Sequence, residues 1–206
     1  LRHLDRGSQE IDNGHYLKFE YVFGATAAAA LYRRKMIDDI SVDGEFFDSD
    51  FFVYREDADV AWRAQLLGWK CIYTPLACGY HVRSVLPGIR RALPADINMH
   101  SVKNRFLMRI KNITPGVYWR NFLSITFRDA TVLVCCVARE QSSLRAFPFL
   151  IKNFRRFIEK RRKIMERRRV SEEYMASWFA YDPVAFPAPK PVKVRNTAPA
   201  RSRAAR

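Results

Sequence analysis

The spacing of apolar and polar residues predicts four short elements in the first third of the chain. Residues 19–32 are almost entirely apolar, and aromatic and β-branched side chains crowd the first half of this run. The run is either a buried strand with Gly24 at a close backbone approach or an alanine-rich helix, and this composition favours a strand in its first half. Residues 33–40 and 56–67 have helical spacing, and a second strand is expected over 69–74.

The second half of the chain has mostly helical spacing. A helix is expected from Asp96 up to Pro115, residues 117–138 predict one or two more, and residues 147–169 predict a single amphipathic helix. One side of this last helix carries an apolar stripe: Phe147, Leu150, Ile151, Phe154, Phe157 and Ile158. The opposite side is basic: Lys152, Arg155, Arg156, Lys160, Arg162 and Lys163. After Asp182 the chain is rich in proline and has no period, so we expect disorder there.

Charge divides the chain more sharply than hydropathy does. The 206 residues carry 36 basic and 21 acidic side chains, a formal net charge of +15. Residues 139–206 hold 18 basic and 6 acidic side chains, against 18 and 15 in residues 1–138. The hydrophobic content of 49% excludes a wholly disordered chain. Four cysteines without a Cys-x-x-Cys pair indicate a reducing compartment, not a disulfide scaffold or a zinc site.

The acidic and aromatic segment over residues 44–63 carries the candidate chemistry. Its middle part, residues 46–54, is expected to be a loop or a short strand. Three carboxylates, Glu56, Asp57 and Asp59, open the helix that follows, where unpaired backbone N–H groups favour ionised side chains. Such a carboxylate can act as a general base, or it can be a helix cap beside core aromatics. In the first interpretation four aromatic residues form a wall that stacks on a sugar: Phe51, Phe52, Tyr54 and Trp62.

An ordered series of short motifs extends this pattern along the chain. Its members are Phe23-Gly24-Ala25, Tyr32-Arg33-Arg34, Asp48, Phe51-Phe52, Glu56-Asp57-Ala58-Asp59, Arg63, Gly68-Trp69, Pro75 and His81. The series resembles the acceptor half of family-2 glycosyltransferases, particularly rhamnosyltransferase-like enzymes that build surface polysaccharides. Lys103-Asn104-Arg105 and the basic, aromatic helices that follow are similar to the C-terminal region of that family. The resemblance covers roughly residues 19–180.

The resemblance implies an α/β fold: an incomplete GT-A (nucleotide-diphospho-sugar transferase) domain followed by C-terminal amphipathic helices. We expect an acceptor-side part over 1–115, a basic amphipathic helical region over 116–180, and a disordered Pro/Arg tail over 181–206. No nucleotide-binding strand–helix pair precedes Glu56, so the donor-binding half of the family's pattern is missing here. The alternative is a non-catalytic, truncated relative that acts as a membrane- or polyanion-binding module.

The resemblance also implies an inverting transfer of a sugar, possibly rhamnose, from a nucleotide-sugar donor to a glycan or polyprenyl-linked acceptor. Asp57 is expected to be the general base, and Glu56 and Asp59 to orient the acceptor or to hold Asp57. A divalent cation, Mn²⁺ or Mg²⁺, is expected to balance the leaving nucleoside diphosphate, with His81 as a ligand. The alternative for His81 is a loop histidine bonded to the backbone. The candidate substrate-binding residues are Gly24, Glu56, Asp59, Trp62 and Arg63, of which Arg63 also fits a structural partner for the acidic cluster.

The basic helix over residues 147–169 has three alternative roles. It can pack on the domain with solvated charges, lie on an anionic membrane surface, or contact nucleic-acid phosphates. A lipid-linked acceptor favours the membrane and makes nucleic acid unlikely, and the aromatic residues of 117–138 add a second candidate interfacial face. The sequence shows neither a signal-peptide pattern nor an apolar run of spanning length. We therefore expect a cytoplasmic protein, peripheral on the inner face of the plasma membrane.

Overall fold

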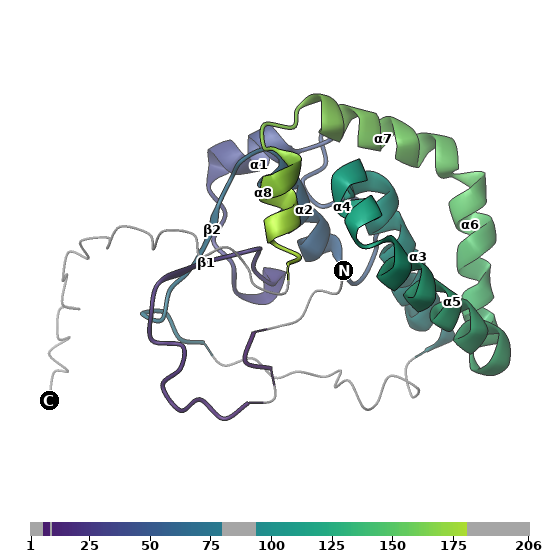
Figure 1. Cartoon of the computed structure of the whole chain (residues 1–206), viewed down its shortest axis with the longest axis horizontal. Coiled ribbons are helices and arrows are strands. Elements are labelled where there is room, and N and C mark those ends of the chain that lie inside the picture. Colours follow the sequence, from purple (N-terminus) through teal and green to yellow (C-terminus); the bar gives the residue numbers. More distant parts are fainter. Residues whose placement is uncertain (1–5, 9, 80–93, 181–206) are drawn as a thin grey trace, which may run out of the picture.

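Helices make up most of the described part of the chain, and the strands described there form one small antiparallel pair (Figure 1). The structure, a computed structural model, describes residues 6–8, 10–79 and 94–180. The strands are β1 (Glu20–Val22) and β2 (Cys71–Tyr73). The α-helices are α1 (Arg34–Ile40), α2 (Glu56–Leu66), α3 (Ala95–Asn112), α4 (Pro115–Arg120), α5 (Phe122–Arg139), α6 (Ala146–Lys152), α7 (Phe154–Glu166) and α8 (Glu172–Ser177). Two 3₁₀ turns are η1 (Ala27–Ala29) and η3 (Gln141–Arg145).

The chain just after β1 packs against α2. Strand β1 pairs with β2 so that Tyr21 lies opposite Ile72. Immediately after β1 the chain approaches α2 so closely that a Cβ on Gly24 would lie 2.1 Å from the Cβ of Ala61. Because no real Cβ contact is that short, only glycine fits here. The close backbone approach expected at Gly24 is confirmed.

Most helix boundaries follow local signals in the sequence. Helix α2 ends where Gly68 adopts a φ of 82°, the left-handed conformation of a glycine after a helix C-terminus. Helix α3 ends before Pro115, which opens α4 as its first residue. The segment over 46–54, expected as a loop or short strand, is a loop with turns.

The prediction of one continuous helix over residues 147–169 is wrong. The chain bends at Asn153 between α6 and α7, where the Asn153 side-chain amide donates to the carbonyl of Phe149 at 2.8 Å. A side chain that competes for main-chain carbonyls weakens the helix at that point. The bend lets α6 pack on α3 and η3 while α7 follows α3 toward α2, which one straight helix could not do.

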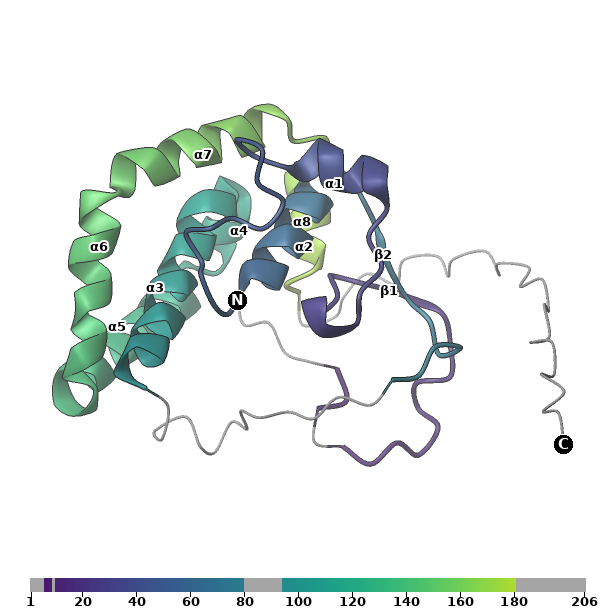
Figure 2. The same ribbon diagram turned by 180° about the vertical axis from the view of Figure 1, so that it is seen from behind.

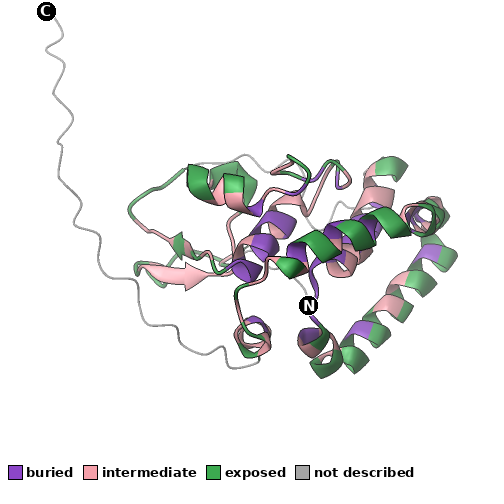
Figure 3. Ribbon diagram, turned by 90° about the horizontal axis from the view of Figure 1, so that it is seen from above, coloured by how far each residue is buried: buried purple, intermediate pink, exposed green. Residues whose placement is uncertain are grey.

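The bend also divides the predicted apolar stripe, as the burial colours of Figure 3 show for these helices. Leu150 and Phe157 are buried, whereas Ile151, Phe154 and Ile158 are exposed. The buried members join one core cluster that draws residues from both halves of the chain, among them Ile40, Phe51, Leu66, Leu107, Ile164 and Met175. The later helices therefore share one core with α2 and α3.

The expectation of a chain that combines helices and strands is confirmed in this coarse sense. The described sheet has two strands, and the rest of the ordered structure is helical. Across residues 6–8, 10–79 and 94–180, we find no helix with both the length and the apolar character of a membrane span. The tail expected over 181–206 lies outside the described residues.

Candidate functional site

The carboxylates at the start of α2 follow a loop with an unusual backbone. Phe52, Tyr54 and Arg55 have φ values of 63°, 64° and 68°. Residues with a Cβ rarely adopt this left-handed conformation, and it persists only where surrounding contacts enforce it. The loop delivers the chain directly to Glu56, the first residue of α2. Figure 2 shows this segment on the face where α2, α3 and α7 come together.

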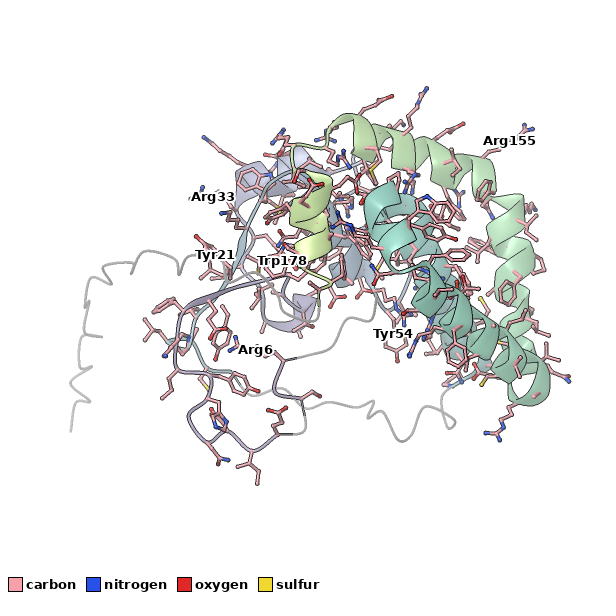
Figure 4. All side chains as sticks on the ribbon, in the orientation of Figure 1. Arg6, Tyr21, Arg33, Tyr54, Arg155 and Trp178 are labelled. Atoms are coloured by element: carbon pink, nitrogen blue, oxygen red, sulfur yellow. The ribbon has the colours of Figure 1, made fainter. Side chains whose placement is uncertain are left out.

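Helix α3 supplies the contacts that hold this loop. The fully buried side-chain amide of Asn104 donates to the carbonyls of Phe51 at 2.8 Å, Val53 at 2.6 Å and Tyr54 at 2.8 Å. Figure 4 shows Tyr54 beside α3. The Lys103 ammonium donates to the carbonyl of Asp50, and burial lowers the pKa of Lys103 to about 8. Lys103 and Asn104 therefore hold the loop in place through hydrogen bonds to its backbone carbonyls, a role that the sequence did not indicate.

Asp59 and Arg63 lie in the core. Their side chains are 0% and 1% exposed and form an ion pair at 2.8 Å. Asp59 also accepts hydrogen bonds from Lys111 at 3.0 Å and Asn112 at 2.6 Å, and Arg63 donates to the carbonyls of Ile40 and Phe46. Burial alone would raise the pKa of Asp59, but the charges of Lys111 and Arg63 outweigh it and lower the pKa. In this structure both residues position the loop and α2, and neither can contact a substrate.

The other aspartates of the loop are also paired. Asp48 accepts from Lys111 and, at 2.7 Å, from Lys160. Asp50 accepts from Lys160 at 2.8 Å and from Arg156. Burial opposes the ionised form of Asp48, yet the two ammonium groups hold its pKa well below the usual range. This ion-pair network joins the loop to α3 and α7, and the sequence offered no sign of which lysines would reach it.

Glu56 and Asp57 differ from these aspartates. Both are partly exposed, and neither forms an ion pair with any described residue. Asp57 accepts a hydrogen bond from the Ala58 N–H at 2.7 Å. One carboxylate oxygen of Glu56 is buried without a hydrogen-bond partner in the described part of the chain, and burial, reinforced by the Asp57 charge, raises the pKa of Glu56.

Tyr32 belongs to the same group. Its hydroxyl is buried and makes no hydrogen bond within the described ranges. Burial raises the pKa of Tyr32, and the carboxylates of Asp57 and Glu56 raise it further. The Tyr32 ring packs edge-on against Phe46, with 5.0 Å between ring centroids. Tyr32, Glu56 and Asp57 thus form a small polar site with unused hydrogen-bonding groups, which we call the α2 carboxylate site.

The remaining predicted site residues lie elsewhere. Trp62 is 3% exposed and packs against Phe23 and Phe179, and Phe51 is fully buried. The expected aromatic wall is therefore wrong for these two residues, because the core takes their rings, whereas Phe52 is 76% exposed. Gly24 allows the chain after β1 to pack closely against Ala61 of α2.

The metal prediction rests on a residue that the structure does not describe. His81 lies outside the described residues. Among residues 6–8, 10–79 and 94–180, no three His, Cys, Asp or Glu side chains are grouped closely enough to hold a metal ion. The described side chains alone thus supply no complete ligand set, and the cation stays a prediction from the resemblance.

Comparisons with known proteins returned no match: no protein-family model, no curated protein and no solved structure is similar to this chain. The functional conclusion therefore depends on the geometry of the α2 carboxylate site and of the loop that presents it.

Proposed function

We propose that this chain forms the acceptor side of an inverting glycosyltransferase of the GT-A type, with Asp57 as the general base. The observation that carries the proposal is the division among the acidic residues. Asp48, Asp50 and Asp59 are held in ion pairs, whereas Glu56 and Asp57 are partly exposed and form no ion pair with another described residue. They follow a backbone of left-handed residues that Asn104 holds in place. Strained, over-determined loops and perturbed carboxyl groups are enriched at functional sites.

The proposed reaction uses Asp57 as a proton acceptor. Its carboxylate takes the proton of the acceptor hydroxyl while that oxygen bonds to the anomeric carbon of the donor sugar. The bond from that carbon to the nucleoside diphosphate breaks on the opposite face, and the configuration inverts. Glu56, whose pKa is raised, lies beside Asp57 and orients the acceptor. No step in this scheme passes through a metal.

The donor in this proposal is a nucleotide sugar, with rhamnose as the candidate sugar, and the acceptor is a glycan or a polyprenyl-linked lipid. A divalent cation, Mn²⁺ or Mg²⁺, with His81 as ligand, would neutralise the leaving diphosphate. The site of action is the inner face of the plasma membrane, reached from the cytoplasm. The sequence predicts that residues 147–169 meet that membrane.

The test is sugar transfer by the protein isolated from its native source, with a panel of nucleotide sugars, Mn²⁺ and a polyprenyl-linked acceptor. Asp57→Asn should abolish transfer and leave the fold intact, because the amide cannot accept the proton. Asp38→Asn is the matched control, since Asp38 is an exposed carboxylate whose ion pair, among the described residues, is with Arg34 on the same helix. A variant Asp57→Asn that keeps most of its turnover would exclude Asp57 as the base.

A non-catalytic, membrane-binding module is the second candidate function. The observation that favours it is the row of exposed apolar side chains on α4 and α5. The two candidates differ in the transfer assay. A native protein that binds vesicles but transfers no sugar from any donor in the panel would favour the binding module.

A further inference from the structure

Helix α5 exposes an apolar face along its whole length. Leu123, Phe127, Val134 and Val137 are 80%, 77%, 64% and 54% exposed. Together with the exposed Ala130, they are spaced by four and three residues, so they lie on one side of the helix. Trp119 of α4, 69% exposed, continues the row, and we call these six residues the α5 stripe. At 18 residues, the helix offers a row about 27 Å long.

The other side of α5 already packs on the protein. Ile125 and Cys136 are buried, and Asp129 pairs with Arg109 of α3 at 2.7 Å. The α5 stripe is therefore not a face that the described fold needs for its own core. In Figure 3 α4 and α5 lie along one edge of the molecule, largely in the colour of exposed residues.

The charges around the stripe have one sign. Arg120, Arg128 and Arg139 are exposed on α4 and α5. The one acidic residue of the sequence between 115 and 139 is Asp129, which Arg109 engages. An exposed apolar row on helices whose exposed charges are all arginines, with tryptophan and phenylalanine at one end, has the chemistry of a helix that lies in the interface of an anionic bilayer.

The basic helices α6 and α7 are less available than the sequence suggested. Arg156 and Lys160 bind Asp50, Lys163 binds Asp43, and Arg169 binds Asp39. Arg155 does point away from the molecule (Figure 4). Much of the positive charge that was expected to meet the membrane is thus used to hold the loops of the protein itself.

We propose that the α5 stripe binds the surface of an anionic lipid bilayer, with Trp119, Leu123 and Phe127 entering the headgroup–acyl boundary. Arg120 and Arg128 meet the lipid phosphates. The α5 stripe is then the membrane contact of the proposed function, on which this proposal rests. It takes the place of residues 147–169 as the principal contact.

A second copy of this chain fits the stripe less well. In a two-fold dimer the same patch meets itself, so the arginines of one protomer would approach those of its partner. Helices α4 and α5 offer no free carboxylate to neutralise them. Anionic lipid phosphates do neutralise them.

The test is co-sedimentation of the full chain with vesicles of equal parts phosphatidylglycerol and phosphatidylcholine. Leu123→Glu/Phe127→Glu should weaken binding about tenfold or more, because two inserted apolar side chains become charged. Both residues are highly exposed, so circular dichroism should show an unchanged fold. The matched control is Ile151→Glu/Ile158→Glu, which changes two exposed apolar residues on α6 and α7 and should retain most of the binding.

Three results would overturn the inference. They are loss of binding in the α6–α7 variant alone, equal binding of the wild type to pure phosphatidylcholine vesicles, and a solution dimer that Leu123→Glu/Phe127→Glu dissociates. The assay contains no sugar donor, so it succeeds or fails independently of the Asp57→Asn transfer test.

Discussion

Replacing Asn104 by alanine should destabilise the protein by about 3–5 kcal/mol. Its side-chain amide has two N–H groups, which serve three backbone carbonyls at 2.6–2.8 Å in the buried end of the strained loop. Two lost hydrogen bonds amount to about 1 kcal/mol each, and a buried carbonyl left unpaired adds about 1–3 kcal/mol. Since domains are stable by only about 5–15 kcal/mol, this loss is large.

Urea unfolding followed by circular dichroism measures the loss. Asn104→Leu keeps roughly the size of the side chain, removes both donors and adds no charge, so a loss similar to that of Asn104→Ala would assign the effect to hydrogen bonding and not to lost packing. Asn121→Ala is the control, because Asn121 donates one hydrogen bond to Val117 within its own turn and should contribute about 1 kcal/mol. If Asn104→Ala were no more destabilising than Asn121→Ala, the loop would not depend on this side chain. Amide exchange at Val53 should also accelerate, since the loop relaxes first.

Two further predictions concern the buried ion pairs. Lys111→Met should lower the free energy of unfolding in urea by about 3–5 kcal/mol, because Asp48 and Asp59 lose a shared buried cation. The control Arg34→Met breaks an exposed ion pair and should change stability by less than about 1 kcal/mol. Equal effects of the two variants would contradict the role of burial. Stability should also fall on acidification below about pH 4, since the lowered pKa values of Asp48 and Asp59 mean that the folded protein binds fewer protons there than the unfolded chain. Acid titration of Asp48→Asn should give a shallower decline, and a stability that rises on acidification would refute the assignment.

Local signals in the sequence were sufficient for most of the secondary structure. The period of residues 56–67 with Gly68 after it located α2, Pro115 separated α3 from α4, and the apolar runs contained both strands. The break at Asn153 was missed, because an apolar stripe with regular spacing continues across it. Helical spacing does not report where a helix must bend to follow a neighbour.

The candidate site was only partly predictable. The carboxylates of α2 could be identified from their clustering, but Asp48, Asp57 and Asp59, which look alike in sequence, differ in the fold. Asp48 and Asp59 are buried with Lys111, and Asp57 is not. The partners that decide this come from α3 and α7, some 50 to 110 residues further along the chain.

The sequence by itself determined most of the helices, the positions of both strands, the close approach at Gly24 and the acidic segment, because backbone propensity, turn chemistry and spacing act over a few residues. The tertiary structure decided which charges are paired, which aromatic rings enter the core, and which face of α5 stays exposed. Those outcomes depend on contacts between distant segments, and ion pairing and burial are set by which side chains the packed helices bring within a few ångströms of each other.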